Sequence, residues 1–251
     1  MKSKFVLLAA LFVSINGFAA EELHKIKIVL VGDSTMNDQG GWGYGFKQFL
    51  TPDVECINTA MNGRSTMSFM TEGRWTNALA LRGNYYFIQF GHNNEAGHPG
   101  RSTDMPTFVS QMKQYVDDTR AIGAKPILVT PLSRRQWDKA NPGKIKSTLT
   151  PYAEEVRKIA AEKNVPLIEL HDRSKEYYEK VGKEKCEEFS PVKTVAGTNT
   201  FDGTHLKGEG RVLMARLVVN ELRTRVPELA PHLLAEPNPA AISPPISEKK
   251  K

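Results

Sequence analysis

Ser34, Asp202 and His205 are the residues of this chain whose types and spacing best suit covalent catalysis. A serine hydroxyl is a weak nucleophile until a base takes its proton, and a histidine is the usual base. The imidazole then needs an acceptor on its second nitrogen, and Asp202 can provide one from the same loop, three residues earlier. The sequence therefore predicts a nucleophile, a base and an orienting carboxylate.

Hydrogen-bond donors for a charged reaction intermediate occur in two further segments. A tetrahedral intermediate carries negative charge on one oxygen, and preorganised donors aimed at that oxygen stabilise it. The backbone N–H groups of Ser34 and Gly63 and the side-chain amide of Asn93 suit this task. Gly63 has no Cβ, so its backbone can approach a ligand closely. We predict that these three groups form an oxyanion hole.

Each of these residues also has an ordinary structural interpretation. Ser34 by itself would be a turn serine or a helix cap, and Asp202-Gly203 by itself is a common turn signal. Asp33 is interpreted only as a turn acceptor. The combination favours catalysis, because one mechanism uses every member of the set.

A metal-dependent deacetylase is the alternative chemistry for the histidines. A zinc site needs two or three histidine or carboxylate ligands at defined spacing. His92 and His98 are six residues apart, and the chain contains no His-Glu-x-x-His helix. We therefore expect neither a metal nor another cofactor.

Five apolar runs alternate with helical patterns and would bring these residues to one edge of a sheet. The expected strands are residues 26–32, 54–60, 85–91, 126–131 and 165–171, and the expected helices are residues 43–50, 74–81, 106–122, 151–164 and 208–226. Residues 174–200 are predicted as a charged helix followed by an irregular polar segment. Strand–helix alternation favours a parallel sheet with helices on both faces and ligands beyond the carboxyl ends of the strands. We predict one α/β domain over residues 21–227.

Both ends of the chain are predicted to lie outside that domain. Lys2 and Lys4 precede an apolar stretch, residues 5–13, and small residues follow, which is typical of a secretory signal peptide over residues 1–20. The apolar stretch is too short to span a bilayer as a helix, which disfavours a membrane anchor. A secreted or periplasmic location is therefore expected. Residues 228–251 are rich in Pro and Ala and end in three lysines, which predicts a flexible tail.

Composition argues against two classes of partner. Most of the formal net charge of +6 comes from lysines in the predicted signal and tail, so bulk charge does not support a nucleic-acid partner. No segment after the signal is long and apolar enough for stable membrane insertion. Export permits a disulfide between Cys56 and Cys186, but their distance in sequence leaves their pairing open.

The amino-acid sequences of the catalytic segments resemble those of a known superfamily. Gly32-Asp33-Ser34, Gly63, Gly91-His92-Asn93 and Asp202-x-x-His205 are similar to the four blocks of SGNH, or GDSL-type, hydrolases. Longer stretches resemble rhamnogalacturonan acetylesterases, namely residues 32–36, 62–66, 72–75, 89–93 and 130–135. The resemblance spans residues 27–222. It implies a three-layer α/β/α sandwich around a five-stranded parallel sheet of flavodoxin-like order 2-1-3-4-5, and it implies the catalytic and oxyanion roles given above.

The resemblance further implies a carbohydrate esterase that removes acetyl groups from pectic polysaccharide through an acetyl-enzyme, without a cofactor. One departure from the family pattern is Asn94, where the family commonly has aspartate, and this bears on substrate choice. Two alternatives stay open. One is an esterase of the same scaffold that acts on acetylated xylan or small acyl esters, and the other is a non-catalytic polysaccharide-binding protein.

Four further residues are candidates for substrate contact. His92 neighbours the predicted amide donor and is expected to line the site or to hold the loop. Trp75 is interpreted as packing beneath the second loop, and contact with a sugar ring is the alternative. Arg134 and Arg135 follow the fourth predicted strand, and a guanidinium suits the carboxylate of a galacturonate unit. An internal salt bridge is the alternative for both arginines.

Overall fold

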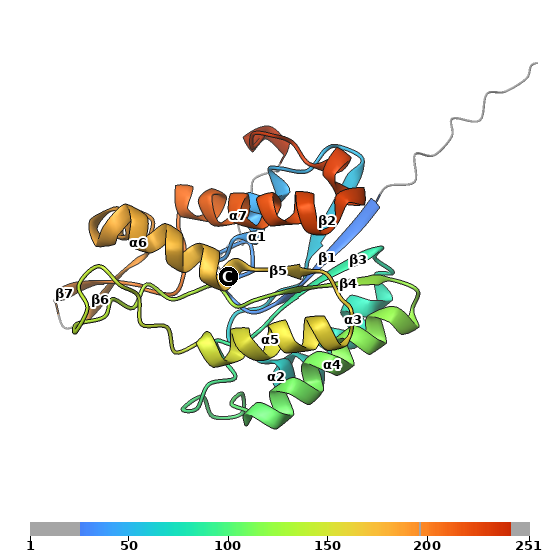
Figure 1. Cartoon of the computed structure of the whole chain (residues 1–251), viewed down its shortest axis with the longest axis horizontal. Coiled ribbons are helices and arrows are strands. Elements are labelled where there is room, and N and C mark those ends of the chain that lie inside the picture. The colour runs from blue at the N-terminus through green and yellow to red at the C-terminus, as the bar shows by residue number, and fades with distance from the viewer. Residues whose placement is uncertain (1–25, 196, 242–251) are drawn as a thin grey trace, which may run out of the picture.

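A five-stranded parallel sheet forms the centre of the molecule (Figure 1). The computed structural model describes residues 26–195 and 197–241, so the predicted signal peptide, residues 1–20, lies outside the described residues. The strands are β1 (Ile26–Gly32), β2 (Val54–Asn58), β3 (Tyr85–Gln89), β4 (Lys125–Val129) and β5 (Leu167–Ile168). They lie in the order β2-β1-β3-β4-β5 and every neighbouring pair is parallel. The predicted sheet order and the predicted α/β class are confirmed.

Helices cover both faces of the sheet and complete three layers (Figure 1). One face carries α1 (Gly43–Lys47), α6 (Leu170–Glu188) and α7 (Glu209–Arg225), and the other carries α2 (Thr66–Thr71), α3 (Arg74–Ala80), α4 (Met105–Ala121) and α5 (Thr150–Glu162). Successive side chains of a strand point to opposite faces, so Leu30 enters one core cluster and Val31 the other. Both faces of the central strands are buried, so polar side chains that bind a ligand must lie in the loops at the strand ends. Among the described helices, none combines the length and the apolar character needed to cross a membrane.

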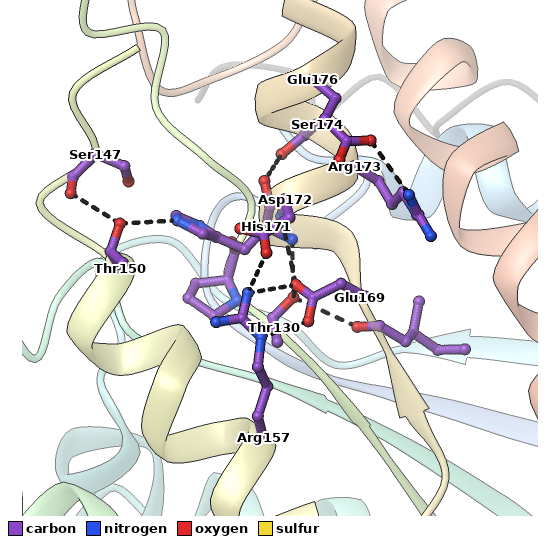
Figure 2. Close-up of polar contacts among 12 residues, drawn as sticks. Thr130, Ser147, Thr150, Arg157, Glu169, His171, Asp172, Arg173, Ser174 and Glu176 are labelled. Atoms are coloured by element: carbon purple, nitrogen blue, oxygen red, sulfur yellow. Dashed lines mark hydrogen bonds and ion pairs between the residues drawn. The ribbon is translucent and has the colours of Figure 1, made fainter.

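Strand β5 is much shorter than the predicted strand at residues 165–171. Glu169 accepts a hydrogen bond from the backbone N–H of Asp172 and caps α6, so the chain enters the helix at Leu170. Arg157 of α5 fixes this carboxylate with hydrogen bonds of 2.6 and 2.9 Å (Figure 2). The segment after Ile168 is therefore helical rather than extended, because the Glu169 side chain caps the start of α6.

His171 lies at the same junction and has a structural role. The ring Nδ1 is 3.1 Å from the carbonyl oxygen of Pro131, and Nε2 is 3.3 Å from the hydroxyl of Thr150 (Figure 2). Burial lowers the pKa of His171 below its ordinary value, which favours the neutral imidazole. The ring therefore joins the loop after β4 to the start of α5.

An antiparallel hairpin, β6 (Val192–Val195) and β7 (Thr198–Phe201), occupies part of the segment predicted to be irregular. The residues of β7 are exposed along its whole length, so the strand lacks the apolar alternation by which a half-buried strand is recognised in a sequence. The hairpin ends directly before Asp202. It is therefore part of the framework of the predicted catalytic loop.

The segment after α7 packs onto the domain, which corrects the predicted flexible tail for residues 228–238. Pro227–His232 forms a 3-10 helix, and the side chains of Leu229 and Leu233 are buried in the core beside α7. The proline content suggested an irregular chain, but the two leucines supply apolar anchors that the composition obscured. Residues 242–251 lie outside the described residues.

Cys56 and Cys186 are free thiols. Cys56 belongs to β2 and Cys186 to α6. The pairing that the sequence left open is therefore not formed in this structure.

Trp75 is a core residue, as the packing interpretation expects, and the alternative of substrate contact is wrong. Its side chain is 4% exposed and packs edge-on against Tyr86 and Tyr115, with ring centroids 5.9 and 4.7 Å away. The indole Nε1–H donates to Asp118 of α4 at 2.9 Å. A buried indole needs such an acceptor, so this contact fixes α3 on α4 beneath the sheet.

Replacement Trp75→Ala should lower the free energy of unfolding by about 3–5 kcal/mol, because it removes a buried aromatic ring and leaves a cavity. Urea unfolding measures this, with Asn77→Ala on the exposed face of the same helix as the control. A variant that keeps wild-type stability but has a raised KM for a glycan would instead restore the substrate-contact interpretation.

Candidate active site

Ser34, His205 and Asp202 are in hydrogen-bond contact beyond the carboxyl ends of the strands. The His205 Nε2 atom is 2.8 Å from Ser34 Oγ, and Nδ1 is 2.9 Å from Asp202 Oδ2. Ser34 lies in the loop that follows β1, and the other two residues come from the loop between β7 and α7. The fold thus brings together the three residues that the sequence predicts as nucleophile, base and orienting carboxylate.

A chain of buried hydrogen bonds holds the loop that carries Ser34. Oδ1 of Asp33 accepts from the backbone N–H and the hydroxyl of Thr35 at 2.8 and 2.7 Å. The Thr35 hydroxyl accepts from Gln89 Nε2 at 2.7 Å, and Gln89 Oε1 accepts from the indole N–H of Trp42 at 2.9 Å. Because these side chains are fully buried, water does not compete for the bonds and the loop is held in one conformation.

Asp202 is held as a carboxylate by donors on both of its oxygens. Oδ1 accepts from the backbone N–H groups of Thr204 and His205 at 2.8 and 3.0 Å, and Lys193 Nζ lies 2.7 Å from Oδ2. Burial raises the pKa of this carboxyl, but the hydrogen bonds from His205, Lys193 and the backbone outweigh burial and hold the pKa of Asp202 well below its ordinary value. Asp202 therefore stays ionised wherever a histidine titrates and can stabilise an imidazolium.

Arg135 fastens the same loop from inside the protein, so its prediction as a substrate contact is wrong. Its side chain is buried, and Nη2 donates to the backbone carbonyls of Asp202, at 2.8 Å, and of His205. The guanidinium carbon lies 5.4 Å from the ring centroid of Tyr178 and 5.8 Å from that of Phe189. The charge of Arg135 is used to position the loop.

The three predicted oxyanion donors line one pocket with the Ser34 hydroxyl. Within the described residues, the backbone N–H groups of Ser34 and Gly63 donate to no other protein atom. The Asn93 amide donates to the carbonyl of Arg64 at 3.1 Å, which leaves its second hydrogen for a ligand. Gly63 has φ +74°, and a Cβ there would lie 2.8 Å from Nη1 of Arg101. The positive φ favours glycine at position 63, and any Cβ there would also displace the end of the Arg101 side chain.

The pocket beside Ser34 has a volume of about 430 Å³ and is lined by polar side chains and glycines. Two carboxamides of its wall are fixed by hydrogen bonds, because Asn37 donates to Asn62 at 2.6 Å and Asn62 donates to Gln39 at 3.0 Å. The described residues that line it are Ser34, Gln39, Gly40, Asn62, Gly63, Asn93, Arg101 and His205. Such walls suit a short acyl group on a hydroxyl-rich carrier. Across residues 26–195 and 197–241, no cluster of three or more potential ligands could hold a metal ion.

His92 and Arg134 are not among the described residues that line this pocket, and their contacts fit the loop-holding and salt-bridge interpretations rather than substrate contact. The His92 side chain is 3% exposed, and its Nδ1 is 3.4 Å from Asp33 Oδ2. Burial raises the pKa of Asp33, but the nearby His92 and the hydrogen bonds from Thr35 hold the pKa below its ordinary value. Arg134 forms an ion pair with Glu95 and donates to the carbonyl of His92 at 3.2 Å. Both side chains connect neighbouring loops.

Asn94, the departure from the family pattern, is also internal. It is fully buried, and its amide donates to the hydroxyls of Thr66 and Thr103 at 2.7 and 2.9 Å. The side chain ties the start of α2 to the loop before α4. Any influence of Asn94 on substrate choice must therefore act through these loops.

Sequence reasoning missed Arg101, Gln39 and Lys193. Arg101 belongs to the long loop between β3 and α4, and Lys193 belongs to β6. No periodicity or spacing marks these positions. The available signal was their location, because loops at the carboxyl ends of parallel strands surround the site in such folds.

Comparisons with known proteins identify a family of ester hydrolases. Residues 30–184 match the GDSL-like lipase/acylhydrolase family. The chain is 33% identical over 225 residues to RhgT, a rhamnogalacturonan acetylesterase of Bacillus subtilis, with 84% of this chain and 95% of RhgT aligned. It is 32% identical over 206 residues to YesY, a probable rhamnogalacturonan acetylesterase of the same organism, with 78% of this chain and 92% of YesY aligned.

Solved structures share the fold. The crystal structure of YxiM from Bacillus subtilis superimposes with a TM-score of 0.67 at 24% identity, over 80% of this chain and 57% of that one. Axe2, an acetylxylan esterase from Geobacillus stearothermophilus, gives a TM-score of 0.58 at 17% identity, over 78% of this chain and 93% of that one. From the family match and the extensive alignment with RhgT, we conclude that the chain belongs to the GDSL-like lipase/acylhydrolase family and is an ester hydrolase.

Proposed function

We propose that this carbohydrate esterase removes acetyl groups from rhamnogalacturonan through Ser34, His205 and Asp202. The observation that carries the proposal is the continuous contact from Ser34 Oγ to His205 and on to Asp202, at 2.8 and 2.9 Å. The substrate is supported by RhgT and YesY, whose names describe this activity and which align with most of the chain. A secreted or periplasmic location is part of the proposal, because residues 1–20 have the pattern of a signal peptide.

In the first half of the reaction, Ser34 attacks the acetyl carbonyl while His205 Nε2 accepts the hydroxyl proton. Asp202 keeps Nδ1 protonated and stabilises the imidazolium that forms. The Ser34 and Gly63 N–H groups and the Asn93 amide donate to the carbonyl oxygen as it becomes negative. The imidazolium then gives its proton to the departing sugar oxygen, which leaves Ser34 acetylated.

In the second half, water replaces the sugar. His205 takes a proton from water, whose oxygen attacks the acetyl carbonyl of the acylated Ser34. The same three donors stabilise the second tetrahedral intermediate. Acetate leaves as the imidazolium returns a proton to Ser34 Oγ, so the enzyme is restored.

The pocket favours an acetylated sugar over a lipid ester. Its described wall presents carboxamides, a guanidinium and backbone groups, and no long apolar side chain. A fatty acyl chain would have to displace water from these polar groups without replacing their hydrogen bonds, which is costly. Gln39 and Asn62 can instead bond to the hydroxyls of a sugar.

Acetate release from acetylated rhamnogalacturonan, compared with release from acetylated xylan, tests the function. We expect the wild type to have the higher kcat/KM on rhamnogalacturonan, and Ser34→Ala to lose release from both because its nucleophile is gone. Equal release by wild type and Ser34→Ala would refute the mechanism. A higher kcat/KM on xylan would refute the substrate.

The pH dependence should report the base. Neutral imidazole is the active form, so kcat/KM should rise with pH as the base loses its proton and then level off. Asp202 adds no limb in this range, because its pKa lies well below its ordinary value. A flat profile between about pH 4 and 9 would contradict the assignment of a histidine as the base.

Replacement Asn93→Ala should lower kcat by a factor on the order of 10²–10³, because it removes an oxyanion donor. Asn77→Ala, on the exposed face of α3, removes the same amide away from the site and serves as the control. Steady-state kinetics on one acetylated substrate measures both variants. A kcat within a factor of two of wild type for Asn93→Ala would exclude this donor.

A further inference from the structure

Within residues 26–195 and 197–241, Arg101 forms no ion pair with a carboxylate. Among the described residues that line the pocket beside Ser34, it alone has a fixed charge. Its side chain is half-buried, and Nη1 donates to the carbonyl of Gly63 at 3.2 Å and to Asn93 Oδ1 at 3.4 Å. Both acceptors are neutral, so the positive charge remains available in the pocket.

Two other arginines near this pocket, unlike Arg101, each form an ion pair with a glutamate. Arg64 forms an ion pair with Glu72 at 2.9 Å, and Arg134 forms one with Glu95. No carboxylate belongs to the described wall of the pocket, and the carboxylate of Asp202 is already shared by His205 and Lys193. Arg101 is therefore the fixed charge that the described wall of the pocket presents, and a negative ligand group would be attracted to it.

We propose that Arg101 is a specificity residue that binds the carboxylate of a uronic acid in the acetylated substrate. This inference rests on the proposed function, since galacturonate is the acidic sugar of that polymer. A guanidinium binds a carboxylate with parallel N–H donors in a fixed planar arrangement. Protein groups within the described chain use only Nη1, which leaves Nε and Nη2 for the ligand.

The position of Arg101 connects substrate charge to the reacting ester. Its contacts with Gly63 and Asn93 hold the guanidinium beside two of the oxyanion donors. A carboxylate bound there would orient the acetyl group toward Ser34 with little loss of side-chain freedom, because the arginine is already held. The sequence assigned this task to Arg134 and Arg135, but those two charges are used inside the protein.

A pair of substrates that differ only in charge tests the proposal. Acetylated rhamnogalacturonan oligosaccharides are compared with the same oligosaccharides after methyl esterification of their carboxylates, and released acetate is measured. We expect the wild type to prefer the free acid in kcat/KM by about tenfold or more, as for a charge-assisted hydrogen bond. Added salt should raise KM for the free acid and leave KM for the methyl ester unchanged.

The ratio of the two kcat/KM values isolates the charge. Arg101 also holds Asn93, so Arg101→Gln should slow both substrates, but a common loss cancels in the ratio. We expect Arg101→Gln to bring the ratio close to one, and Arg101→Lys to keep part of the preference. Arg82→Gln removes the same charge from an exposed position beside the amino ends of β1 and β3, and it should leave the ratio unchanged.

The outcomes separate this proposal from the function on which it rests. Acetate release at equal kcat/KM from both forms, or an unchanged preference in Arg101→Gln, would overturn the role of Arg101 while the pectic activity stands. No release from either form, with release from acetylated xylan, would overturn both.

Discussion

The hydrogen bond between Ser34 Oγ and His205 Nε2 is the contact that the loops at this edge of the sheet hold in place. It joins residues separated by 171 positions, one in the loop after β1 and one in the loop before α7. Buried bonds among Asp33, Thr35 and Gln89 hold the first loop, and Arg135 holds the second. The backbone N–H of Leu206 donates to the carbonyl of Gly40 at 2.8 Å and ties one loop to the other. The sheet and its helices provide the fixed frame for these contacts.

At the carboxyl ends of the strands, some cationic side chains hold the catalytic loop and another faces the substrate pocket. Arg135 is buried and faces backbone carbonyls, so it positions the catalytic loop and presents no charge to a ligand. Lys193 lies on the carboxylate of Asp202 and helps to keep it ionised. Arg101 faces the pocket without an acidic partner in the described chain. Arg135 and Lys193 therefore position the catalytic loop, whereas Arg101 is available to bind a charged group of the substrate.

Sequence reasoning succeeded where burial or chemistry leaves a pattern. The run Tyr85–Gln89 is buried on both faces and is recognisable as a central strand, and the ordered catalytic segments pointed to the residues that meet at the sheet edge. It failed where the direction of a side chain decides the role. Trp75 and Arg135 have types that suit sugars, but both point into the protein. Arg101 carries no local signal, because only the folded loops show that it reaches the pocket.

In the proposed mechanism, hydrolysis proceeds through an acetyl group bound covalently to Ser34. Acid quenching during turnover of an acetyl ester, followed by peptide mass spectrometry, tests it directly. We expect an acetyl group on the peptide that contains Ser34 in the wild type, and none on that peptide in Ser34→Ala. Acetate release at the wild-type rate with the acetyl group on a different residue would contradict it.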